Sequence, residues 1–193
     1  MPSQVPAGYT RGAILFMGPM QDETGEASLL QRFWDEAGAY GSRILIIANF
    51  GSDDSLPERY GRRFAEWESD SVTHLSLESR QDAQRDGAAT LVENATGILL
   101  VGDSPLRMAS TVGGTILATA IRRANARGKV ICGAGACASI LCQHMIAYDN
   151  RKSMPHPFLH RRLFRRADNL KSRVFNYVQI RLPVKTTPVH GRA

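Results

Sequence analysis

The sequence predicts a three-layer α/β domain, built on a doubly wound and mostly parallel sheet with helices on both faces. Short apolar runs alternate with amphipathic stretches from residue 13 to about residue 147. The connections between them are short and rich in glycine or polar residues. Strict alternation of strands and helices with short connections is typical of parallel sheets covered on both sides.

Each expected element follows from its own pattern. The apolar residues of the first helix recur on one face, and the strand at 43–48 has enough branched residues to be buried on both sides. Strands are expected at residues 13–17, 43–48, 72–77, 97–101 and 129–132, and helices at 24–39, 55–67, 82–94, 115–127 and 136–147. Binding sites in such sheets form at the carboxyl ends of strands. The turns of functional interest are therefore 18–23, 48–54, 102–114 and 133–137.

The chain is expected to hold one domain, residues 1–148, followed by a basic C-terminal extension, residues 149–193. Its 193 residues suffice for one well-buried core. After residue 148 the alternation stops. Residues 149–157 read as a polar linker, 158–173 as a helix with a thin apolar stripe, and 174–182 as one further strand, with a disordered end after it.

Charge separates these two parts of the chain. Residues 1–150 hold 13 basic and 17 acidic residues, a net charge of −4, whereas residues 151–193 hold 11 basic residues and one acidic residue, a net charge of +10. Such an asymmetry indicates that the extension meets an acidic partner. A solvated basic terminus with no partner is the alternative.

Composition indicates a cytoplasmic protein without a membrane span. No apolar run approaches the roughly 20 residues that a span needs, and the first residues do not have the pattern of a secretory signal. Cys132, Cys137 and Cys142 form an odd cluster in one segment, which favours free thiols in a reducing compartment. They make no CxxC pair, so no zinc site is expected. The phosphate-loop motif is absent as well, and no cofactor is expected.

Three stretches resemble the cyanophycinase and aspartyl-dipeptidase family of serine peptidases. They are Ile14-Leu15-Phe16-Met17-Gly18 with the strand that follows, residues 95–103 continuing through Arg107 to Thr115, and residues 128–136 with His144-Met145-Ile146. Together they span about residues 12–147. The resemblance implies a class I glutamine amidotransferase-like fold and, in the family, hydrolysis of peptides by a serine nucleophile.

The sequence departs from the family pattern where that chemistry is carried. The family reads Gly-Thr-Ser-Ala-Gly-Ala at a sharp strand-to-helix elbow, and its nucleophilic serine corresponds here to Gly135. Asp103 is retained in the substrate-holding turn, although the glutamine after it is not, and Arg107 follows one inserted residue. The family's general-base histidine falls on Pro157, between His156 and His160. No counterpart is found for the family's remaining sheet and the acidic residue of its triad. These departures predict a degenerate member.

Cys137 is the one candidate for a displaced nucleophile. It has small neighbours on both sides, as a tight elbow requires, and a thiol near a helix N-terminus has a lowered pKa. It lies two residues beyond the family's serine position, so a small buried cysteine is the alternative. His144 lies about two helical turns further, roughly 10 Å along the axis and too far for a direct hydrogen bond. Ser139 is expected to pack or cap.

The extension supplies the candidate binding residues. Arg161, Arg162, Arg165 and Arg166 follow one another closely, with Phe158 and Phe164 interleaved. Arginine pairs and aromatic anchors suit an acidic protein surface. Nucleic acid and a second copy of this chain are the alternatives, but no nucleic-acid motif is present. A truncated sheet edge that needs covering also favours an oligomer, or pairing with an active relative. The sequence thus predicts a non-catalytic scaffold or binding domain, with a Cys137 hydrolase and a nucleic-acid module as alternatives.

Overall fold

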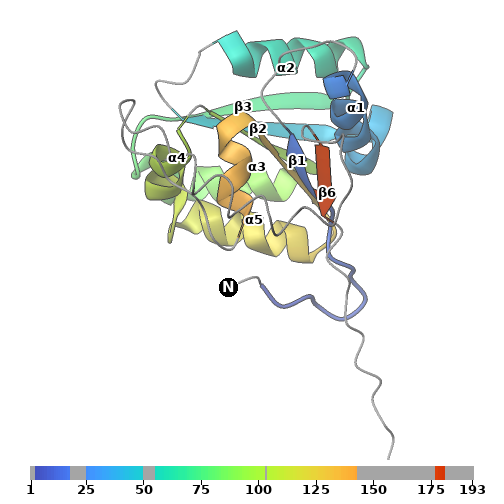
Figure 1. The fold of residues 1–193 in the computed structure, drawn as a ribbon. Helices are drawn as coiled ribbons and strands as arrows, with labels where there is room; N and C mark the ends of the chain where they lie inside the picture. The colour runs from blue at the N-terminus through green and yellow to red at the C-terminus, as the bar shows by residue number, and fades with distance from the viewer. Residues whose placement is uncertain (1–2, 18–24, 50–54, 103, 143–176, 181–193) are drawn as a thin grey trace, which may run out of the picture.

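Six strands form one sheet in the order β3-β2-β4-β5-β1-β6 (Figure 1). The computed structural model describes residues 3–17, 25–49, 55–102, 104–142 and 177–180. The strands are β1 (Ile14–Met17), β2 (Arg43–Asn49), β3 (Ser71–Leu77), β4 (Gly97–Val101), β5 (Val130–Ala134) and β6 (Tyr177–Ile180). The first five run parallel, and β6 pairs antiparallel with β1. The predicted mostly parallel sheet is confirmed.

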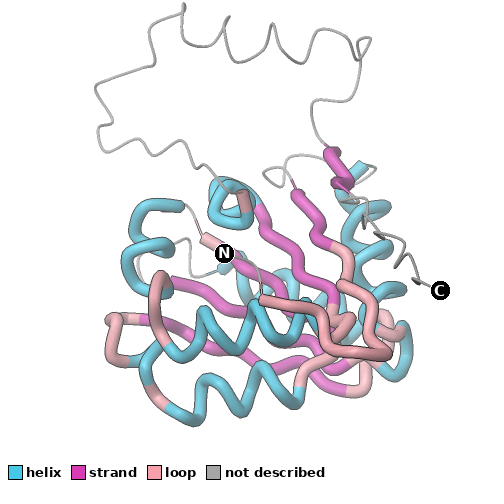
Figure 2. The backbone as a smooth tube through the Cα atoms, turned by 90° about the horizontal axis from the view of Figure 1, so that it is seen from below, coloured by secondary structure: helices cyan, strands magenta, loops and turns pink. Residues whose placement is uncertain are grey.

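Helices cover both faces of this sheet (Figures 1 and 2). On one face lie α1 (Gly25–Ala37) and α2 (Ser55–Glu66). On the other lie α3 (Asp86–Asn94), α4 (Pro105–Val112) and α5 (Ile116–Ala126). Short 3-10 segments, η1 (Ala39–Gly41), η2 (Asp82–Gln84) and η3 (Gly135–Leu141), complete the described elements. None of the helices described is long and apolar enough to cross a membrane.

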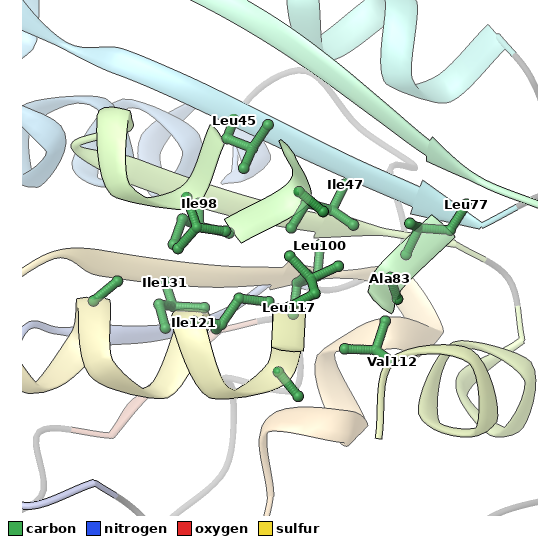
Figure 3. Packing of buried hydrophobic residues seen from close by; sticks show 14 of the residues in the cluster. Leu45, Ile47, Leu77, Ala83, Ile98, Leu100, Val112, Leu117, Ile121 and Ile131 are labelled. Carbon is green, nitrogen blue, oxygen red and sulfur yellow. The ribbon is translucent and has the colours of Figure 1, made fainter. Parts of the chain in front are cut away.

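The central strands carry the core on both of their faces. In β2, Leu45 and Ile47 point into the cluster beneath α3, α4 and α5, whereas Ile44 and Ile46 point into the cluster beneath α1 and α2. Figure 3 shows the first of these clusters. All four side chains are 1% exposed or less. Full burial of one such aliphatic side chain contributes about 1.5–3 kcal/mol. The expectation of a strand buried on both faces is confirmed.

Residues 102–114 are not the simple turn that the sequence analysis predicted. They include α4, which begins after Ser104, whose side-chain oxygen accepts a hydrogen bond from the Arg107 N–H at 3.3 Å. Pro105 at the first helical position and the buried pair Met108 and Val112 are the other helix signals. The sequence analysis did not recognise this helix because it has only eight residues, several of them small.

The segment after β5 also differs from the expected α-helix at 136–147. Its described part, η3, is a 3-10 helix, and residues 143–147 lie outside the described residues. The tight winding brings the backbone of Ala138 back onto β5, where a Cβ on Gly133 would lie 2.6 Å from the Ala138 Cα. A glycine in the strand therefore permits this return. The expected strand within 174–182 is present as β6, whereas the expected helix at 158–173 falls outside the described residues.

We expect Gly133→Ala to lower the free energy of unfolding by about 1–3 kcal/mol, because the added methyl group meets backbone that cannot rotate away. Chemical denaturation followed by circular dichroism measures this loss. The matched control is Gly87→Ala in α3, where an added Cβ meets nothing within 4 Å. That change should stabilise the protein by about 0.5–1 kcal/mol. Equal effects at the two positions would contradict the close packing of η3 on β5.

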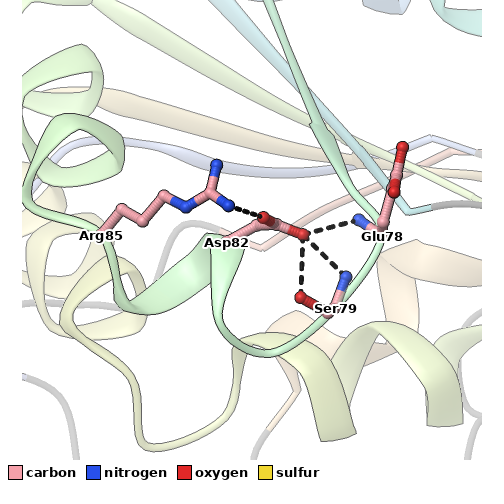
Figure 4. A network of polar contacts seen from close by, with 4 residues as sticks. All are labelled: Glu78, Ser79, Asp82 and Arg85. Atoms are coloured by element: carbon pink, nitrogen blue, oxygen red, sulfur yellow. Dashed lines mark hydrogen bonds and ion pairs between the residues drawn. The ribbon is translucent and has the colours of Figure 1, made fainter.

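The loop between β3 and α3 is organised by one carboxylate, that of Asp82 (Figure 4). Its Oδ2 accepts hydrogen bonds from the Glu78 N–H at 3.1 Å, the Ser79 N–H at 2.8 Å and the Ser79 hydroxyl at 3.0 Å. Its Oδ1 pairs with Arg85 at 3.0 Å. The hydrogen bonds from Ser79, with the Arg85 charge and the Glu78 N–H, hold the pKa of Asp82 below its ordinary value of 3.8.

This network predicts a stability difference that depends on pH. Because the folded-state pKa of Asp82 is lowered, its stabilising effect is complete above about pH 3.8 and is lost as the pH falls through the folded-state value. The gap in unfolding free energy between wild type and Asp82→Asn should be constant near neutral pH and narrow below about pH 3.8. Asp70→Asn, which removes an exposed carboxylate outside the network, gives the baseline. A gap that widened in acid would show that the network does not stabilise the ionised carboxylate.

Candidate functional site

After β2 and β4 the chain leaves the sheet toward opposite faces, and this divergence makes the carboxyl edge of the sheet a candidate site. The two strands are neighbours, with Ala48 opposite Val101. After β2 the chain continues to α2 on one face, and after β4 it continues to α4 on the other. Crevices of α/β sheets form where adjacent strands send their connections to opposite faces.

Asn49, Gly102 and Cys137 meet at this divergence. Asn49 ends β2, Gly102 follows β4, and Cys137 lies in η3. A Cβ placed on Gly102 would collide with the Asn49 side-chain oxygen and would lie 2.8 Å from the Cys137 Sγ. Asn49 is 2% exposed and Cys137 is 0% exposed. Asn49 and Cys137 can therefore approach residue 102 this closely only because it is a glycine.

The turn after β5 has the geometry of a strand-to-helix elbow. The strand ends at Ala134, Gly135 adopts a left-handed φ of +61°, and η3 begins at once. Among described atoms, only the Gly102 carbonyl oxygen comes within 4 Å of a Cβ built on Gly135, at 3.8 Å. Within the described part of the chain, a Cβ at this position would therefore make one ordinary van der Waals contact. A sharp turn of this kind is how α/β hydrolases raise a nucleophile above the sheet, but glycine and the exposed Ala136 supply none here.

The three cysteines have different surroundings. Cys137 belongs to the apolar cluster that contains Leu100 and Met108. Cys132 is buried in the opposite cluster, and burial raises the pKa of its thiol far above the ordinary value. Cys142 is the exposed cysteine, and partial desolvation raises its pKa as well. Among the residues that the structure describes, no group of three or more histidines, cysteines and acids could hold a metal ion.

The remaining candidates are only partly described. Arg107 lies exposed on α4, the helix that follows β4, and the Ser139 hydroxyl donates to the Ala136 carbonyl oxygen at 2.9 Å. The other candidates fall outside the described residues: Asp103, His144, His156, His160, Arg161, Arg162, Arg165 and Arg166. The structure adds Asn49, which the sequence analysis did not single out. A polar residue that ends an otherwise aliphatic strand was the available signal.

Comparison with known proteins finds cyanophycinases among the relatives of this chain. No protein-family model matches the sequence. A cyanophycinase of Geminocystis herdmanii is 28% identical over 150 residues, which is 77% of this chain and 55% of that protein. A cyanophycinase of Trichormus variabilis is 27% identical over 140 residues, 72% of this chain and 47% of that protein. The chain thus spans about half the length of the curated relatives it matches.

A solved structure shares the fold. The crystal structure of a peptidase from an acI-B1 Actinobacterium superposes with a TM-score of 0.56 at 22% identity, over 67% of this chain and 57% of that one. At this identity the likeness supports the α/β architecture alone. The chain thus resembles cyanophycinases in sequence over about three quarters of its length, and it resembles this solved peptidase in fold.

Proposed function

We propose that this chain is a cyanophycinase-like domain without peptidase activity, which acts as a scaffold or binding subunit. The observation that carries the proposal is Gly135. It stands where the family has its serine, at an elbow whose φ is +61°. A serine peptidase attacks the scissile carbonyl with a hydroxyl oxygen. Glycine has no atom for that step.

The other parts of the family's machinery are also altered in the sequence. The general-base histidine corresponds to Pro157, and the substrate-holding glutamine is replaced beside Asp103. A base is needed to take the proton from the nucleophile, and its loss alone costs several orders of magnitude in rate. Changes at the nucleophile position, the general-base position and the substrate-holding position together favour a loss of activity.

A hydrolase that uses Cys137 is the second candidate. Its Sγ lies beside Gly102 at the sheet edge, close to where the family's chemistry takes place. The thiol nevertheless sits at 0% exposure in an apolar cluster. A nucleophile must come within about 3–3.5 Å of the carbonyl carbon, so a substrate would have to displace η3. This burial supports the non-catalytic reading.

The basic extension is the part of the chain that we assign to a partner. Residues 151–193 carry a net charge of +10, whereas residues 1–150 carry a net charge of −4. An acidic protein surface, in a larger complex, in a second copy of this chain or in an active relative, matches the paired arginines Arg161-Arg162 and Arg165-Arg166. Nucleic acid would match the charge alone, because the sequence holds no recognition motif.

We expect the purified full chain to release no product from β-aspartyl-arginine or related short peptides above the buffer rate. Cys137→Ala should give the same result, because neither protein carries an exposed nucleophile at the elbow. An active cyanophycinase, assayed beside it, supplies the positive control. Turnover that disappears in Cys137→Ala, with folding intact by circular dichroism, would establish the cysteine hydrolase instead.

Thiol labelling of the folded protein provides the independent check on this assay. Cys142 should react first, while Cys132 and Cys137 should react only at the rate of unfolding, because both side chains are buried. Peptide mapping by mass spectrometry assigns each adduct. The variant Cys142→Ser removes the fast site and leaves the other two. Fast labelling of Cys137 in that variant would contradict the buried position on which the proposal depends.

A further inference from the structure

A groove of about 500 Å³ runs between α3 and α5, away from the elbow. Ala89 and Ala120 line it beside Glu93, and Arg123, Arg127 and Lys129 line it as well. Lys129 precedes β5, whereas the elbow follows it. The Lys129 end of the groove is therefore separated from the elbow by the length of that strand, about 16 Å.

The groove carries an excess of positive charge. Three cations line it against one carboxylate, Glu93. The ion pairs among the described residues, within 4.0 Å, involve none of these four side chains. Arg123 and Arg127 are exposed, lie four residues apart at the end of α5, and both line the groove. This end of the groove can accept an anion.

Lys129 is held in place at this end by the terminus of α3. Its Nζ donates to the carbonyl oxygens of Val92, at 3.1 Å, and of Glu93. Arg43 donates to the next carbonyl oxygen, that of Asn94, at 2.7 Å. Desolvation lowers the pKa of Lys129, and the charges of Arg43 and Arg127 lower it further. A bound carboxylate would offset this repulsion between neighbouring cations.

At the opposite end of the groove, two backbone N–H groups already have hydrogen-bond acceptors within the protein. At the start of α5, the Ile116 N–H donates to the Gln84 side-chain oxygen and the Ala118 N–H donates to the Thr115 hydroxyl, both at 3.3 Å. Two of the helix-terminal donors that would attract an anion are thus occupied. The negative group of a ligand is therefore expected at the Arg123 end, with a polar and apolar strip leading away from it.

We propose that the groove between α3 and α5 binds an acidic peptide, with a carboxylate side chain between Arg123 and Arg127. The 11 residues of α5 span about 16 Å, the length of roughly five extended peptide residues. A compact anion such as phosphate would use only the cationic end and leave the alanine-floored strip empty. The inference goes beyond the proposed loss of peptidase activity, because it uses no residue of the elbow.

Fluorescence anisotropy with the full chain tests the proposal. The probe is a labelled hexapeptide of alternating aspartate and alanine, compared with the same peptide carrying asparagine. We expect the aspartate peptide to bind and the asparagine peptide not to bind. Replacing Arg123 and Arg127 together by glutamine should weaken binding at least about tenfold, since both cations contact the carboxylates.

Two controls separate the groove from surface charge elsewhere. Arg59→Gln with Arg62→Gln removes the same charge from α2, on the opposite face of the sheet, and should change the dissociation constant less than about twofold. Arg122→Gln, on the same helix but outside the groove lining, should have equally little effect.

Arg165→Gln with Arg166→Gln measures the share of the binding that belongs to the extension. Circular dichroism verifies folding of each variant, and amide chemical shifts on titration should move at Thr119 and Lys129.

Three results would overturn the proposal. Wild type that does not distinguish the two peptides has no acidic-peptide site. Binding that survives the change at Arg123 and Arg127, but falls with the change at Arg165 and Arg166, belongs to the extension and would support the proposed function alone. Displacement of the peptide by an equal concentration of inorganic phosphate would make the groove a compact-anion site.

Discussion

The close approach of three chain segments at the carboxyl edge of the sheet is the constraint on which the candidate site depends. The return of η3 over β5 requires a bare Cα at Gly133, and the meeting of Asn49 with Cys137 requires one at Gly102. Neither contact is a strong interaction by itself. Together they fix where the chain turns after β5, because protein interiors are packed too closely to admit even one additional methyl group without adjustment.

This packing is compatible with a glycine at the elbow. Among the described residues, only the Gly102 carbonyl oxygen lies within 4 Å of a Cβ built on Gly135. Glycine adopts the φ of +61° found there at less cost than serine would. The same packing keeps Cys137 in the core, where its side chain packs and does not meet solvent.

The sequence was sufficient for the sheet because its signals are local and strong. Aliphatic runs such as residues 44–48 and 97–101 predicted the central strands, and the burial of both their faces follows from the same pattern. The helix α4 and the 3-10 winding of η3 were missed, because small residues give weak periodicity and tertiary contacts decide such segments. The role of Asn49 was hidden for another reason: its proximity to Gly102 and Cys137 depends on strand order, which no single stretch of sequence contains.

Both the groove between α3 and α5 and the basic extension are proposed to bind partners that carry negative charge. Both involve arginine pairs, and neither needs the elbow for its chemistry. Both proposals therefore concern binding at places that do not include Gly135.

The most direct test of this account is to return the missing side chain and measure hydrolysis. Gly135→Ser places a hydroxyl at the elbow, where the described atoms leave room for a Cβ. The account predicts that the folded variant, like wild type, releases no product from β-aspartyl-arginine, because the base position is lost at Pro157 as well. Turnover gained by the serine variant would contradict it, since the remaining catalytic machinery would then have been intact.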